Sequence, residues 1–156
     1  MSKYQHLITD ENRKWWTLGA MCLALFMVML DNTVVNVALP SIQRDLDTSI
    51  SGLEWIVNGY TLSFAVLLAV GGRGGDIFGR RKAFTFGVVI FTVASATAGF
   101  APSNFALVAS RVLQGVGAAF MMPGTLSIIT DAFPAHERGK AIGTWAGFAG
   151  AGGIIG

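Results

Sequence analysis

Residues 15–39, WWTLGAMCLALFMVMLDNTVVNVAL, decide the class of fold. Asp31 is the only charged residue in this run. The run is longer than the roughly 20 apolar residues that a helix needs to cross a hydrocarbon core of about 30 Å. No small-residue cleavage site with a polar mature segment follows it, which argues against a signal peptide. The run therefore predicts a transmembrane helix.

Four further apolar segments follow, at residues 52–72, 83–100, 105–130 and 141–156, and the last is still apolar at Gly156. Hydrophobic residues make up 53% of the chain and charged residues 13%, whereas soluble domains carry about 25% charge. The connections are short, so consecutive helices should be antiparallel neighbours. We expect an all-α integral membrane protein, an antiparallel bundle of transmembrane helices whose fifth member is truncated.

Lysine and arginine residues are distributed unevenly between the two ends of this bundle. The connections at one end contain only Arg44. The other end holds Lys3, Arg13, Lys14, Arg73, Arg80, Arg81, Lys82, Arg138 and Lys140. Because basic residues concentrate in cytoplasmic segments, the basic end is expected to be cytoplasmic. Residues 1–14 would then form the cytoplasmic tail of a multi-pass protein of the plasma membrane.

Two charged residues, Asp31 and Arg111, lie deep inside predicted membrane helices, whereas Glu54 lies near an outer end. A charge at the bilayer centre costs at least about 2.5–3.5 kcal/mol, so it is rarely unpaired or exposed to lipid. Counted from Pro40 and Asn104 at the outer helix ends, they lie roughly 13 Å and roughly 10 Å deep. They could face one aqueous cavity, where Asp31 would bind and release a proton as its neighbours change. A fixed structural ion pair is the alternative.

Polar and soft side chains accompany these two charges at helical spacing. The candidates for a substrate cavity are Asn32, Asn36, Asn58, Gln114, Met122 and Thr125. Those on the fourth helix share the face of Arg111, where Gln114 could line the cavity or only satisfy Arg111. The asparagines could bind substrate or form hydrogen bonds to neighbouring helices.

Glycine patterns mark two further places. Residues 71–82, GGRGGDIFGRRK, join the second and third helices, and glycines there permit a tight turn. Asp76 is expected near the start of the third helix, where a negative charge suits the helix dipole. In the fifth helix, Gly143 and Gly147 lie on a face of small residues that lets helices pack closely. Gly152 and Gly156 continue this theme on another side.

Several functions find little support in the sequence. There is no G-x-G-x-x-G or P-loop pattern for nucleotides and no nucleophile–base set for an enzyme. His6 and His136 have no neighbours that would complete a metal site, so no metal or cofactor is expected. The net charge is only +2 and no basic stripe with interleaved aromatics is present, which argues against nucleic acid.

Four segments resemble signatures of the major facilitator superfamily, and more narrowly of its drug–proton antiporters with fourteen membrane helices. Residues 30–40, LDNTVVNVALP, are similar to the helix-one motif of that subgroup, and residues 111–119, RVLQGVGAA, to the helix-four motif. The fifth helix resembles the start of the antiporter motif G-x-x-x-G-P, with Gly152 and Gly156 at its glycines.

The fourth resemblance is to the family's loop motif between helices two and three. Its main positions are matched by Gly72, Asp76, Gly79, Arg80 and Arg81. Gly74 stands where the family usually has Leu, and Ile77 where many members have Arg.

This resemblance implies two six-helix domains around a central cavity with alternating access. It implies that Arg111 takes part in proton transfer and that the Asp76 loop latches the cytoplasmic side against a second half absent from this chain. The implied function is proton-coupled efflux of small lipophilic or cationic drugs across the bilayer, and the fragment alone is not expected to transport. The alternatives are a related exporter of a metabolite, lipid or amino acid, and a non-transporting membrane scaffold or sensor.

Overall fold

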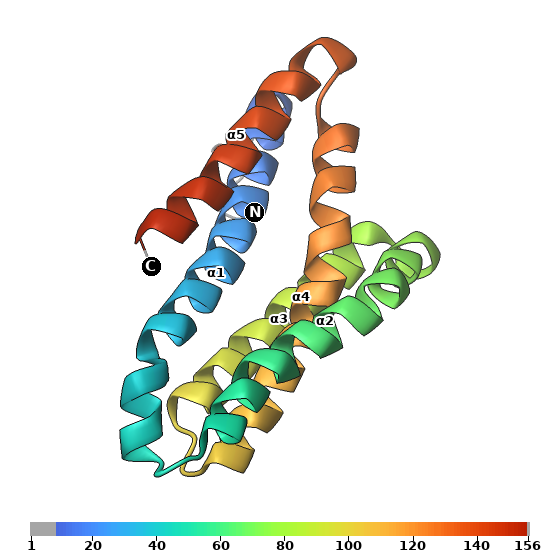
Figure 1. Cartoon of the computed structure of the whole chain (residues 1–156). Coiled ribbons are helices and arrows are strands. Elements are labelled where there is room, and N and C mark those ends of the chain that lie inside the picture. The colour runs from blue at the N-terminus through green and yellow to red at the C-terminus, as the bar shows by residue number, and fades with distance from the viewer. Residues whose placement is uncertain (1–8, 156) are drawn as a thin grey trace, which may run out of the picture.

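Five helices and their short connections make up residues 9–155, the part that the computed structural model describes (Figure 1). They are α1 Asp10–Asp45, α2 Ile50–Phe78, α3 Arg80–Gly99, α4 Asn104–Ala132 and α5 Ala135–Ile155. Each of α1 to α4 is long and apolar enough to cross a membrane. The predicted all-α membrane bundle is confirmed, with consecutive helices running in alternating directions (Figure 1).

The sequence predicted that the first helix ends before Pro40. In the structure, α1 continues through Pro40 to Asp45. Proline lacks an N–H donor, so the carbonyl group of Asn36, four residues earlier, loses its helical partner. Both residues are exposed, and that carbonyl is therefore accessible to other donors. Pro40 removes one hydrogen bond without ending the helix.

The second and third helices include almost all of the predicted loop at residues 73–82. Only Gly79 separates them, and its φ of +98° is a left-handed conformation that a side chain would strain. Asp76 consequently lies in the last turn of α2. The prediction that it lies at the start of α3, where its charge would suit the helix dipole, was wrong. Its carboxylate instead forms an ion pair of 3.4 Å with Arg80.

The fourth helix lies at the centre of a three-helix group, packed along α2 and α3 (Figure 1). Glycines allow the backbones to approach closely. A Cβ atom at Gly71 of α2 would lie 2.1 Å from the carbonyl oxygen of Ala119, and one at Gly117 of α4 would lie 2.6 Å from the Phe91 nitrogen. Close backbone packing of this kind drives helix association where lipid removes the hydrophobic effect.

The fifth helix lies along the first and runs in the same direction, forming a helix pair (Figure 1). The pair contacts the three-helix group through a buried apolar cluster of Leu18, Met21, Cys22, Ile128, Ile129, Phe133 and Ala141. Among the glycines predicted to form packing faces on α5, Gly152 meets α1, because a Cβ there would lie 2.9 Å from Met29 Cβ. Gly143 and Gly147 are exposed with no atom near an added Cβ, and Gly156 lies outside the described residues.

Enlarging Gly71 should separate α2 from α4. Gly71→Ala places its methyl group against the backbone of Ala119, and we expect the free energy of unfolding to fall by about 1–3 kcal/mol. Thermal unfolding of the purified full-length protein measures this change. Gly99→Ala is the matched control, because a Cβ at that position meets no atom within 4 Å. Equal stability of the two variants would contradict the proposed close approach.

Candidate functional site

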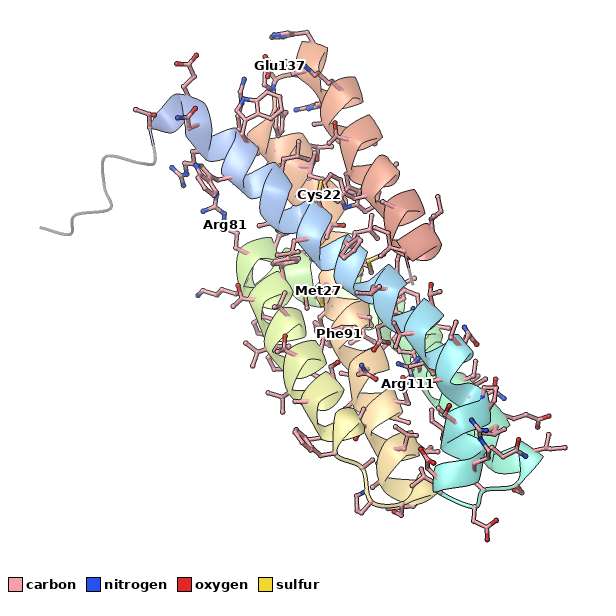
Figure 2. The ribbon with its side chains drawn as sticks, turned by 90° about the vertical axis from the view of Figure 1, so that its left-hand side faces the viewer. Cys22, Met27, Arg81, Phe91, Arg111 and Glu137 are labelled. Atoms are coloured by element: carbon pink, nitrogen blue, oxygen red, sulfur yellow. The ribbon has the colours of Figure 1, made fainter. Side chains whose placement is uncertain are left out.

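Asp31 of α1 and Arg111 of α4 form an ion pair. Figure 2 shows Arg111 inside the bundle, away from the end where Arg81 and Glu137 lie. The Nη1 atom of Arg111 donates a hydrogen bond of 2.5 Å to Oδ2 of Asp31. The structure therefore brings together the two residues whose depth the sequence had placed at a similar level.

Gln114, one helical turn after Arg111, completes a network of three side chains. Its Oε1 accepts a hydrogen bond of 2.9 Å from Arg111, and its Nε2 donates one of 2.7 Å to Oδ1 of Asp31. Both carboxylate oxygens of Asp31 thus bind donors on α4. Gln114 does more than satisfy Arg111, because it also holds the carboxylate directly.

The second helix supplies the remaining contacts of the guanidinium. Arg111 Nε donates a hydrogen bond of 3.3 Å to the carbonyl oxygen of Ile56. The Tyr60 ring lies beneath the guanidinium carbon, with 4.5 Å between that carbon and the ring centroid. Cations bind favourably over aromatic faces, more so where water is excluded. Arg111 is therefore contacted from α1, α2 and α4 together.

Burial gives this network its energetic weight. The side chain of Arg111 is 2% exposed and that of Asp31 is 14% exposed. Removing one partner of a buried pair strands an uncompensated charge, which is far more costly than losing an exposed pair. A proton added to Asp31 has a similar effect, since it removes the negative charge opposite Arg111.

The other predicted cavity residues, all within the described part of the chain, form no hydrogen bond to Asp31 or Arg111. Thr125 is buried and donates to the carbonyl oxygen of Met122, which is itself half-buried. Asn32 and Asn36 donate to carbonyl oxygens one turn earlier in α1. Asn58 lies exposed on α2. The structure thus gathers Gln114 around the two charges, and the substrate roles of the other five residues stay predictions.

The residues of the loop motif lie at the opposite end of the three-helix group. Arg80 lies between two carboxylates, 3.4 Å from Asp76 and 3.8 Å from Asp131 at the end of α4. Gly72 joins Asp76 and Arg80 in lining a cavity of about 250 Å³ there. Arg81 lines a separate polar pocket beside Asp131. The sequence analysis missed Asp131, because nothing in one sequence shows that the ends of α2 and α4 meet.

The same end holds an ion pair within the helix pair. Lys14 of α1 donates a hydrogen bond of 2.5 Å to Glu137 of α5, which lowers the pKa of Glu137 below its usual value of 4.5. A carboxyl group whose pKa is lower in the folded state than in the unfolded state stabilises the fold at pH values above the unfolded-state pKa. This stabilisation is lost as the pH falls through the folded-state pKa. The pair therefore favours packing of α5 on α1 at neutral pH.

Residues 21–156 match the family described as the Major Facilitator Superfamily. The match covers most of the chain, and the protein belongs to this family of membrane transporters. The family expected from the four sequence signatures is thereby confirmed.

Several relatives are named as resistance or transport proteins. The puromycin resistance protein pur8 of Streptomyces alboniger is 45% identical over 147 residues, which are 94% of this chain and 29% of that protein. The tetracenomycin C resistance and export protein of Streptomyces glaucescens is 45% identical over 90% of this chain and 26% of its own length. The riboflavin transporter RibZ of Clostridioides difficile is 35% identical over 92% of this chain and 32% of its own. The chain spans less than a third of these relatives.

A solved structure shares the fold. It is the crystal structure of a bacterial homolog of the human lysosomal transporter Spinster, in an inward-facing and unoccupied conformation. The two superpose with a TM-score of 0.82 at 26% sequence identity, over 91% of this chain and 30% of the other. The helix arrangement described above is thus that of a known transporter.

Arg111 and Asp31 should depend on each other for stability. We expect Arg111→Leu to lower the free energy of unfolding of the full-length protein by about 3–5 kcal/mol, because it leaves Asp31 without its counterion. Asp31→Asn in the same protein should restore part of that loss, as chemical unfolding would show. A double variant less stable than Arg111→Leu would contradict the pairing.

Acid should weaken the attachment of α5 through Glu137. The free energy of unfolding should decline as pH falls below 4.5. Lys14→Met should reduce this decline, because the hydrogen bond that lowers the pKa of Glu137 is then absent. Thermal unfolding midpoints between pH 6 and about pH 3 would measure it. Lys82→Met removes the same charge elsewhere and should leave the acid decline unchanged.

Proposed function

We propose that the complete protein exports a small molecule in exchange for protons and that Asp31 is the proton-binding group. The observation that carries this proposal is the Asp31–Arg111–Gln114 network, where one carboxylate joins α1 to α4 within the membrane region. A ligand shifts a conformational equilibrium only as far as it binds the two states differently. A proton meets this requirement, because it removes the charge of Asp31 that pairs with Arg111 and favours the state in which α1 packs against α4.

Substrate export follows if proton and substrate act on the same network in opposite directions. In the ionised state Asp31 attracts cationic groups, and in the protonated state that attraction is lost. We propose that Gln114, within this network, contacts the substrate, together with the other residues predicted from the sequence on α1, α2 and α4: Asn32, Asn36, Asn58, Met122 and Thr125. In an alternating-access cycle, protonation from outside would release the substrate and reset the carrier.

The basic end of the bundle is assigned to the cytoplasm of a plasma-membrane protein. Support comes from the positive-inside rule and from the meeting of Arg13, Lys14 and Arg81 at one end. The N-terminus would then be cytoplasmic. The cluster of Asp76, Arg80 and Asp131 faces the same side, where it would latch against the second half of the full-length transporter.

The names of the relatives support a drug-like substrate. Puromycin, tetracenomycin C and actinorhodin appear in the names of three proteins that are each 45% identical to this chain. A metabolite is the second candidate, favoured by the 35% identity to a riboflavin transporter. Competition of puromycin and riboflavin for transport by the full-length protein separates the two classes.

Proton coupling is tested with the full-length protein in vesicles that carry a defined proton gradient. We expect the gradient to drive puromycin transport, and Asp31→Asn to reduce this driven transport at least tenfold, because the side chain can no longer exchange a proton. Asp47→Asn is a matched control, as Asp47 lies outside the helices between α1 and α2. Puromycin transport that does not depend on the proton gradient, or that is undiminished in Asp31→Asn, would reject proton coupling through Asp31.

A further inference from the structure

Arg111 has two kinds of partner, and only Asp31 carries a negative charge that an added proton removes. Asp31 on α1 is an ionisable group that can be neutralised. On α2 the contacts are the Ile56 carbonyl oxygen and the Tyr60 ring, and on α4 the contact is the Gln114 amide. Arginine itself stays charged in proteins. After protonation of Asp31, the cation must therefore rely on the neutral groups of α2 and α4.

The second helix is built to keep those neutral groups in place. A Cβ on Gly115, four residues after Arg111, would lie 2.5 Å from the carbonyl oxygen of Tyr60. The backbone of Tyr60 is therefore pressed against α4. Its ring is 6% exposed and lies parallel to that of Phe64, with 6.0 Å between the centroids. The ring that supports Arg111 is thus fixed from two directions.

The attachment of α1 is different. The atoms nearest to an added Cβ at Gly115 and at Gly117 of α4 belong to α2 or α3 and not to α1. Among the described residues, the ion pair between Asp31 and Arg111 is the one that joins the helix pair α1–α5 to the three-helix group α2–α4. Protonation therefore acts at the junction between these two groups of helices.

We infer that Tyr60 is a positioning residue that, with the Ile56 carbonyl, retains Arg111 on the three-helix group while Asp31 is neutral, so that α1 is the element released. This inference deepens the proposed proton coupling and rests on it for its role in transport. The ionisable side chains that face Asp31 are Arg111 from α4 and Tyr60 from α2, and the Tyr60 hydroxyl also lies beside Asn32 of α1. Removal of the ring should lower the stability of the protein more when Asp31 is neutral than when it is ionised, because ionised Asp31 still serves as the counterion of Arg111.

The first test is a thermal unfolding comparison of the full-length protein that uses Asp31→Asn as the neutral form. We expect Tyr60→Leu to lower the unfolding midpoint more in the Asp31→Asn background than in the wild-type background, by an excess of about 1–3 °C. Tyr60→Phe keeps the ring and should show no such excess. Phe86→Leu, which removes an aromatic ring on α3 that packs against Phe120 and not against Tyr60, is the matched control. Equal losses in both backgrounds overturn the inference.

The second test is the pH profile of gradient-driven puromycin transport. We expect Tyr60→Leu to move the half-maximal pH downward by about half a unit, because protonation of Asp31 becomes less favourable. Tyr60→Phe and Phe86→Leu should keep the wild-type midpoint, and an unmoved midpoint in Tyr60→Leu overturns the inference. If wild-type transport does not respond to pH at all, the proposed function fails, while the unfolding comparison still decides the role of Tyr60.

Discussion

The buried guanidinium of Arg111 is the constraint on which the arrangement of this bundle depends. Its charge cannot be removed and its side chain is 2% exposed, so the protein must surround it with acceptors. A carboxylate from α1, a backbone carbonyl and an aromatic ring from α2, and an amide from α4 meet this need. Three helices that could otherwise slide along apolar faces are thereby fixed at one depth and one rotation.

Two kinds of helix contact hold the rest of the molecule together. Within α2, α3 and α4, glycines such as Gly71 and Gly117 bring backbones into direct contact, so that even one methyl group would not fit. Between this group and the α1–α5 pair, the contacts are made by larger apolar side chains and by Asp31. Apolar side chains can change rotamer as helices move, whereas interlocked backbones leave no such freedom. The fold therefore contains a group of helices with interlocked backbones and a helix pair attached to it by apolar side chains and one ion pair.

The sequence was sufficient to predict the helices and the central pair, because each follows from hydropathy and from the cost of a buried charge. It was insufficient at helix ends. The first helix continues past Pro40, where the sequence predicts its end, and the single residue Gly79 connects α2 to α3, where the sequence predicts a longer loop. Tyr60 was missed because the rotation of α2 about its axis decides whether a ring faces Arg111 or lipid. A buried arginine that needs an aromatic partner on a neighbouring helix was the available signal.

The ion pairs away from Arg111 follow the same division. Asp76, Arg80 and Asp131 belong to α2, α3 and α4, while Lys14 and Glu137 belong to α1 and α5. Each of these pairs lies within one group of helices, so a relative movement of the two groups would leave all of them intact. The same movement would separate Asp31 from Arg111. The distribution of charges thus concentrates the electrostatic resistance to that movement in a single carboxylate, which one proton is enough to neutralise.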